Sequence, residues 1–212
     1  MSAANSKLLA CRQCGRLAGF LAQVRRDHPG YHARPVLPFG VAAPKLLIVG
    51  LAPGMHGANR TGRPFTGDTA GILLYKTLYT HGLANQPEGA DPNDGLKLQH
   101  CRITNAVKCL PPENKPLPAE IRQCNAYLRA EIAALPKSAV LFALGNVSHQ
   151  AILRALDLKL KDYPFEHGAV HELPEGRALF DSYHCSRYNT NTRRLTPEMF
   201  DAVVAAIARR IL

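Results

Sequence analysis

The sequence predicts an α/β protein with three layers, helices on both faces of a central, mainly parallel four-stranded sheet. Four short apolar runs are spaced along the 212 residues, and segments with helical periodicity separate them. Strands that alternate with helices favour right-handed crossovers, which place neighbouring strands parallel. No repeat or long linker divides the chain, so residues 1–212 are expected to form a single domain.

Each predicted strand is a short run of mainly apolar and β-branched residues, as buried strands usually are. The four runs are residues 45–49 (KLLIV), 102–107 (RITNAV), 139–144 (AVLFAL) and 178–183 (ALFDSY).

Helices are predicted where apolar residues recur at helical spacing behind a residue that can cap the N-terminus. They cover residues 69–80, 118–135, 147–156 and 197–211, and a further helix near 5–24 should carry or flank the first two cysteines. Two excursions interrupt this alternation: residues 84–100 predict a polar surface loop, and residues 158–176 have room for a small hairpin.

Charge favours a polyanionic partner. Lysine and arginine number 26 against 16 aspartates and glutamates, for a net charge of +10, and residues 1–40 carry six basic side chains against Asp27 alone. Such an excess attracts DNA or RNA, although many basic proteins bind neither.

No apolar run approaches a membrane span and no secretory signal is evident, so the expected location is the cytoplasm, at the nucleoid.

Six cysteines are present, and in a reducing compartment they are not expected to form disulfides. Cys11 and Cys14 form a CxxC pair, and the proline-rich stretch from Cys109 to Cys124 suits a stiff loop that leads into a helix. Four thiolates can hold zinc or a [4Fe–4S] cluster, and spacing alone does not decide between them. The alternative is a redox CxxC with two buried cysteines. Two others are expected to be small buried residues, Cys101 and Cys185.

Polar and glycine-rich segments follow three of the predicted strands. Ligands of open α/β sheets bind beyond the carboxyl ends of the strands, so chemistry is expected there. The glycine-rich stretch 50–68 can turn tightly and offer amide donors, but it has neither P-loop nor dinucleotide-fingerprint spacing. By glycine content alone it is a weak nucleotide-loop signal.

Three segments together with the four cysteines resemble the uracil-DNA glycosylase superfamily, and most closely its iron–sulfur family 5. The segments are GLAPGMHGANRTGRPFTGD (50–68), TNAVKCLPPENKP (104–116) and HCSRYN (184–189). The resemblance implies a monofunctional hydrolase that flips uracil out of double-stranded or single-stranded DNA and cleaves its N-glycosidic bond, leaving an abasic site. It also implies a [4Fe–4S] cluster, zinc being less favoured, and acceptance of other deaminated or damaged bases. A monomer is the simpler expectation for a protein that scans DNA with one site.

The same resemblance implies a base pocket. Its substrate-binding residues are Gly50, Ala52, Phe65 and Asn105. Phe65 would stack on the base, and the Asn105 amide offers both a donor and an acceptor to the uracil edge. The alternatives are a core phenylalanine and an asparagine that caps a turn.

The catalytic candidates are Asp68, His184 and Asn59. His184 would donate a hydrogen bond to uracil O2 as negative charge grows on the leaving base. Related families carry a carboxylate at the second or third position of the first motif, where this chain has Leu51 and Ala52. Asp68 is therefore the best remaining water activator, with capping of the helix at 69–80 as its alternative role. Asn59 could position the water.

Other residues receive plainer predictions. Arg187 and Asn189 would contact DNA, with a solvated polar loop as the alternative. Lys108 is the lysine to test for lyase chemistry, whereas His149 and His167 are expected at the surface.

Two other functions remain open from the residues. Absence of carboxylates at Leu51 and Ala52 would suit a protein that binds damaged bases without cutting. The cysteines alone would also suit a zinc-stabilised nucleotide-binding module.

Overall fold

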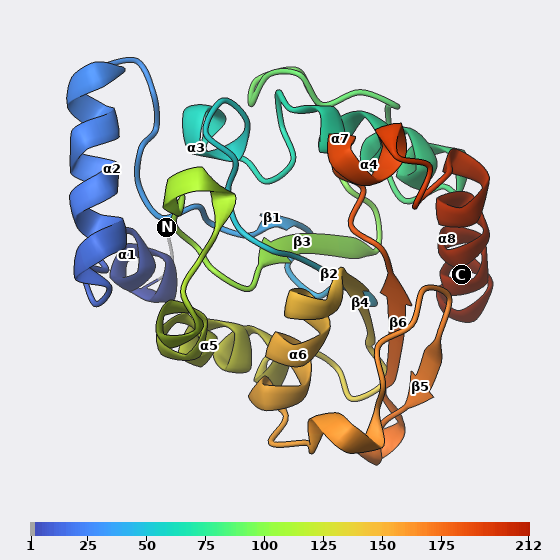
Figure 1. Ribbon diagram of the computed structural model, residues 1–212. Coiled ribbons are helices and arrows are strands. Elements are labelled where there is room, and N and C mark those ends of the chain that lie inside the picture. Colours follow the sequence, from blue (N-terminus) through green and yellow to red (C-terminus); the bar gives the residue numbers. More distant parts are fainter. Residues whose placement is uncertain (1–2) are drawn as a thin grey trace.

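The computed structural model describes residues 3–212 and shows helices packed on both faces of a mixed sheet (Figure 1). Strand order is β1-β3-β2-β4-β6-β5, and the four inner strands are parallel. The strands are β1 (Phe39–Gly40), β2 (Leu46–Gly50), β3 (Cys101–Asn105), β4 (Val140–Leu144), β5 (Val170–Glu172) and β6 (Ala178–Ser182). The predicted α/β class is confirmed. The single domain expected over residues 1–212 stays a prediction, and its residues 1–2 lie outside the described residues.

The predicted number of strands was wrong, because the sheet has six strands and not four. The two additional strands, β1 and β5, pair antiparallel with β3 and β6 at the two edges of the sheet. They are only two and three residues long, too short for an apolar periodicity. The hairpin expected within 158–176 forms instead between β5 and β6.

The helices match their predicted positions to within a few residues, apart from the first. The N-terminal helix expected near 5–24 is two helices, and Cys11 and Cys14 lie between them. The helices are α1 (Ala3–Leu9), α2 (Gly15–Asp27), α3 (Ala58–Thr61), α4 (Thr69–Thr80), α5 (Pro118–Ala133), α6 (Asn146–Ala155), α7 (Arg187–Asn191) and α8 (Pro197–Ile211).

Both faces of the sheet are buried, as the central strand β2 shows. Leu46 and Ile48 point into the core formed with α4 and α8, whereas Leu47 and Val49 point into the core formed with α5 and α6. Successive side chains of a strand alternate between faces, so an uninterrupted apolar run is what a doubly covered strand requires. Among the described residues, no helix is long and apolar enough to cross a membrane.

Candidate active site

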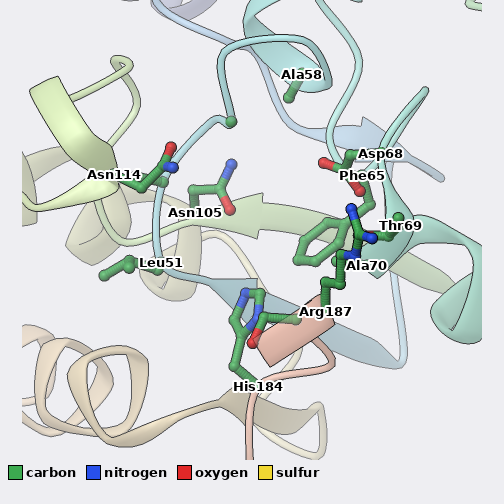
Figure 2. Close-up of a pocket in the computed structure, with 13 residues that line it drawn as sticks. Leu51, Ala58, Phe65, Asp68, Thr69, Ala70, Asn105, Asn114, His184 and Arg187 are labelled. Atoms are coloured by element: carbon green, nitrogen blue, oxygen red, sulfur yellow. The ribbon is translucent and has the colours of Figure 1, made fainter. Parts of the chain in front are cut away.

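A pocket of about 390 Å³ opens where β2, β3 and β6 end and their loops begin (Figure 2). Side chains from three segments far apart in the sequence, within 51–70, 105–114 and 184–187, converge on it, as expected for the carboxyl edge of a parallel sheet. Six predicted site residues line it: Ala52, Phe65, Asp68, Asn105, His184 and Arg187. The structure therefore brings together most of the predicted substrate-binding and catalytic residues.

Gly50 ends β2 and makes room for the pocket side chains. A Cβ at this position would lie 2.5 Å from Oδ1 of Asn105 and 2.7 Å from Cζ of Phe65. Both distances are shorter than nonbonded atoms tolerate. Gly50 was predicted to bind substrate but is not among the residues that line the pocket, and its effect there is a missing side chain, which lets Phe65 and Asn105 approach the strand end.

Replacing Gly50 by alanine should displace Phe65 or Asn105. Misplacement of a positioning group by about 1 Å can lower a rate roughly 100-fold, and we expect a loss of that order in kcat/KM for Gly50→Ala. Gly19→Ala is the matched control, because a Cβ there meets no atom within 4 Å. Full activity in a folded Gly50→Ala protein would contradict this account of the pocket.

Phe65 is held in an unusual backbone conformation. Its φ is 53°, in the left-handed region that non-glycine residues rarely adopt. Gly71 of α4 permits this, since a Cβ there would come within 1.9 Å of the Phe65 carbonyl oxygen. The Phe65 ring contacts the core as well as the pocket, and it lies 5.9 Å from the His184 ring at an interplanar angle of 26°. A strained residue at a pocket wall is typical of a functional site.

Asp68 lines the pocket and takes the alternative role that the sequence suggested, as a helix cap. It caps α4, because its Oδ1 accepts a hydrogen bond from the Gly71 N–H at 2.9 Å. Its Oδ2 lies against Gly57, where a Cβ would come within 2.3 Å of that oxygen. Burial raises the pKa of Asp68, although hydrogen bonds from the backbone N–H groups of Gly71 and Ala70 oppose the rise. One oxygen is thus committed to the helix while the residue also faces the pocket.

Asn105 carries an unpaired polar atom. The residue is 4% exposed, yet its Oδ1 has no hydrogen-bond partner among residues 3–212. A buried carbonyl oxygen without a donor costs roughly 1–3 kcal/mol, so native proteins seldom leave one unexplained. A ligand N–H in the pocket would satisfy it.

His184 follows β6, and Figure 2 shows its ring directed into the same space as the Phe65 ring. Burial lowers the pKa of His184 to about 4, so the ring is neutral near pH 7 and carries one N–H. Its backbone is anchored by Asn189, whose Nδ2 donates to the His184 carbonyl oxygen at 2.8 Å. The Nδ2 group of Asn189 is therefore used to hold this loop. Arg187, the other predicted DNA contact, is exposed at the pocket mouth.

Asn59 is not among the residues that line the pocket. It lies in α3 with no exposed surface, and neither Oδ1 nor Nδ2 has a partner among the described residues. Its backbone holds the glycine-rich loop together, because its N–H donates to the Gly54 carbonyl and its carbonyl accepts from the Ala33 N–H.

Several pocket residues received no role from the sequence. They are Leu51, Gly54, Ala58, Thr69, Ala70, Asn114 and Ser186. Asn114 is notable because it is polar and has a φ of 57° in the turn Pro112–Asn114. It falls inside the segment TNAVKCLPPENKP, so membership of that segment was the available signal.

The four predicted metal-binding cysteines line one small cavity between the α1–α2 connection, the loop after β3 and α5. Burial is the main reason why the pKa values of Cys14, Cys109 and Cys124 are raised, that of Cys109 to about 12. Crowded, partly buried thiols are poor thiolates by themselves, and a cationic centre bound among them would stabilise the ionised form. This donor set suits zinc or an iron–sulfur cluster. Cys101 and Cys185 are buried elsewhere, as predicted, and all six cysteines are free.

Lys108 is unsuited to lyase chemistry. It is 1% exposed, and its Nζ contacts Glu131 Oε1 at 2.7 Å and Thr104 Oγ1 at 2.5 Å. It does not line the pocket.

The expectation that His149 lies at the surface was wrong, because its side chain is 1% exposed and hydrogen-bonded to Asp181 of β6. His167, which was also expected at the surface, is partly buried.

Comparison with known proteins agrees with this arrangement. A family model described as the uracil DNA glycosylase superfamily matches residues 37–208, and the chain therefore belongs to that superfamily.

Within it, the chain is similar to proteins named type-5 uracil-DNA glycosylase. It is 46% identical over 207 residues to the one from Thermus thermophilus, covering 95% of this chain and 94% of that protein. It is 43% identical to the Mycobacterium tuberculosis protein, covering 94% of this chain and 77% of the relative. A type-4 uracil-DNA glycosylase from Archaeoglobus fulgidus is 28% identical, with 79% of this chain and 70% of that protein covered.

Proposed function

We propose that this protein is a monofunctional uracil-DNA glycosylase, a hydrolase of the N-glycosidic bond between uracil and deoxyribose. Membership of the superfamily and the names of its relatives support the activity. The structural observation that supports it best is the unpaired buried Oδ1 of Asn105 in a pocket walled by Phe65 and His184.

The pocket suits a flipped pyrimidine. A base inside a duplex is out of reach, so its nucleotide must be extruded at a cost of roughly a few kcal/mol. Uracil N3–H can donate to Oδ1 of Asn105, and the Asn105 Nδ2 can donate to uracil O4. The ring of Phe65 offers a face for stacking. Cytosine has an acceptor at N3 and an amino group at C4. With the same orientation of the Asn105 amide, acceptor would face acceptor and donor would face donor, so binding of cytosine is disfavoured.

Cleavage breaks the bond between C1′ and N1, and its electron pair leaves with uracil. The neutral His184 donates its N–H toward uracil O2, where the negative charge of the departing base develops. Asp68 accepts a proton from the water whose oxygen bonds to C1′, and the sugar needs limited base assistance if it gains oxocarbenium character first. Asn59 is proposed to support this water from behind the glycine-rich loop.

The exposed arginine at the pocket mouth, Arg187, is proposed to hold the DNA. Arg187 can contact a phosphate, and the net charge of +10 favours association. Asn189 keeps its Oδ1 for DNA while its Nδ2 holds His184. The finer features of the partner are proposals of the same kind: a monomer at the nucleoid that acts on double-stranded DNA, accepts single strands, and also removes bases such as hypoxanthine or hydroxymethyluracil.

We further propose that the four cysteines hold a [4Fe–4S] cluster, with zinc as the second choice. The ligands would be Cys11, Cys14, Cys109 and Cys124, which line one cavity apart from the base pocket. Held by these cysteines, the cluster would join the N-terminal helices to the loop after β3 and to α5. Its contribution is structural, so no step of base removal passes through it.

Cys109→Ala should lower stability more than it changes the chemistry of the folded fraction. Loss of a metal ligand belongs to the largest destabilising substitutions, on the order of 3–5 kcal/mol. At roughly 2–4 °C per kcal/mol for a chain of this size, the thermal midpoint should fall by about 6–20 °C and iron content should drop.

Cys101→Ala is the control for this prediction, since Cys101 is buried in the opposite core and does not line the cysteine cavity. It should keep its iron. Loss of activity in Cys109→Ala at unchanged stability and iron content would contradict a structural role.

Strand scission tests the activity directly. The purified protein is incubated with a labelled duplex that holds one uracil opposite guanine, with and without alkali afterwards. Cleavage that requires alkali supports the proposed function. Cleavage without alkali, in the absence of contaminating endonuclease, would contradict a monofunctional reaction.

A protein that binds damaged bases without cutting is the less favoured alternative. Tight binding to uracil-containing DNA with no abasic product after long incubation would support it and overturn the proposed hydrolase. Asp68 and His184 lining the pocket favour the hydrolase.

A further inference from the structure

A second cluster of histidine and aspartate side chains lies on the face of β6 opposite to α8, outside the base pocket and the cysteine cavity. Asp181 is the fourth of the five residues of β6 and has no exposed surface. Its Oδ1 lies 2.9 Å from Nδ1 of His149 on α6, and its Oδ2 lies 3.2 Å from Nε2 of His171 on β5. The three ligand atoms lie within 4.8 Å of one another.

The hydrogen bond on the other nitrogen of His149 fixes which ring atom faces Asp181. Nε2 of His149 lies 2.8 Å from the Tyr163 carbonyl oxygen. A carbonyl can only accept, so Nε2 carries the hydrogen. In a neutral ring Nδ1 then presents a lone pair toward a carboxylate oxygen at 2.9 Å. Two facing lone pairs repel, so this contact calls either for a proton shared by the two atoms or for a metal ion that both of them bind.

We propose that His149, His171 and Asp181 form a binding site for a divalent transition-metal ion, for which zinc is the best match. Two imidazoles and a carboxylate are a donor set that zinc accepts, with a water completing four-coordination. Metal-binding histidines usually donate their second N–H to a backbone carbonyl, as His149 does to Tyr163. The two imidazoles approach different oxygens of one carboxylate, so the donors already converge.

The surroundings allow such an ion to enter and to be retained. The His171 side chain is 13% exposed on the edge strand β5, which provides a route from solvent. Phe165 packs against the His149 ring at 5.6 Å, and Tyr163 packs against the His171 ring at 5.8 Å. These aromatic rings limit the water around the donors, and a drier site strengthens the attraction between a dication and a carboxylate.

A metal ion here would fasten three segments together: α6, the β5–β6 hairpin and the loop before it. Asp181 also holds that loop through its backbone, because its N–H donates to the Ala169 carbonyl and its carbonyl accepts from the Gly168 N–H. Asp181 precedes His184 by three residues, so the ion would stiffen the strand that carries a pocket residue. The site is separate from the proposed reaction and does not depend on it.

Cobalt(II) and zinc binding to the protein as isolated tests the site. After dialysis against a chelator that leaves the iron content unchanged, we expect one equivalent of zinc to bind and the thermal midpoint to rise. Cobalt(II) should give visible absorption without a thiolate-to-cobalt charge-transfer band, which distinguishes this site from the cysteines. Binding should release protons and weaken at low pH.

His171→Gln keeps a polar side chain at the edge strand but removes the imidazole ligand. It should weaken zinc binding by at least roughly 10- to 100-fold and abolish the zinc-dependent rise in the thermal midpoint. His167→Gln is the matched control, because His167 lies in the loop just before β5 and contacts Ser182 and Tyr183 instead. It should bind zinc like the parent protein.

His171→Cys provides a positive test if the glutamine variant is unstable. It should retain metal and introduce the thiolate-to-cobalt band, which would place residue 171 in the coordination sphere. The proposal is overturned if the parent protein binds no additional zinc, if His171→Gln binds it unchanged, or if the parent protein already shows the thiolate band.

Discussion

His184→Ala should lower kcat roughly 100- to 1,000-fold with little change in KM. Removing one preorganised donor to a developing oxyanion typically has this effect, because the hydrogen bond strengthens only as charge forms. His184 lines the pocket with its ring almost parallel to that of Phe65, and its lowered pKa of about 4 leaves it a neutral donor near pH 7. Single-turnover excision from a uracil-containing duplex measures the effect.

The control for His184→Ala is His167→Ala. His167 also contacts the end of β6, through Ser182 and Tyr183, but does not line the pocket. It should retain nearly full kcat. If His184→Ala keeps full activity, the proposed stabilisation of the departing base is wrong.

Asp68→Asn is expected to reduce kcat by about 100- to 10,000-fold, the range associated with loss of a general base. Asparagine is nearly isosteric and is also a good N-cap, so the bond from the Gly71 N–H to Oδ1 should persist. The thermal midpoint should therefore change little while the rate falls. A large loss of stability with a preserved rate would show that Asp68 acts mainly as a cap.

The pH profile provides an independent test of Asp68. Burial raises its pKa above the ordinary value of 3.8, and the carboxylate form is the one that accepts a proton. The rate should consequently fall as pH decreases through this raised pKa. The residual activity of Asp68→Asn should lack that acid limb. An acid limb that persists in Asp68→Asn would belong to another group, such as His184, whose pKa is lowered to about 4.

Much of the fold could be predicted from local pattern. The cores of the four inner strands were identified because a doubly covered parallel strand leaves an uninterrupted apolar run, as in residues 46–49. The edge strands β1 and β5 were missed because two or three residues leave no periodic signal. The break between α1 and α2 was not predicted, because the sequence suggested one helix near 5–24 that carries or flanks the CxxC pair.

The site residues were predicted only in part, because local segments reveal some of them and distant contacts decide the others. Phe65, Asp68, Asn105 and His184 lie in recognisable segments, and all four line the pocket. Asn114 lies in one of those segments and was overlooked, because only the turn at Pro112–Asn114 directs it to the pocket. His149 was placed at the surface because its partner Asp181 is distant in sequence.

The amino-acid sequence by itself determined the α/β class, the covered strands, the glycine-rich loop and the residue types available for base recognition. Apolar periodicity and local turn chemistry act over a few residues and can be recognised without knowledge of distant contacts. Only the tertiary structure decided that Gly50 leaves space for Asn105 and Phe65, that Lys108 is buried against Glu131, and that two histidines meet Asp181. Each of these facts depends on strand order and on helix packing across the sheet, which bring residues together that local pattern cannot relate.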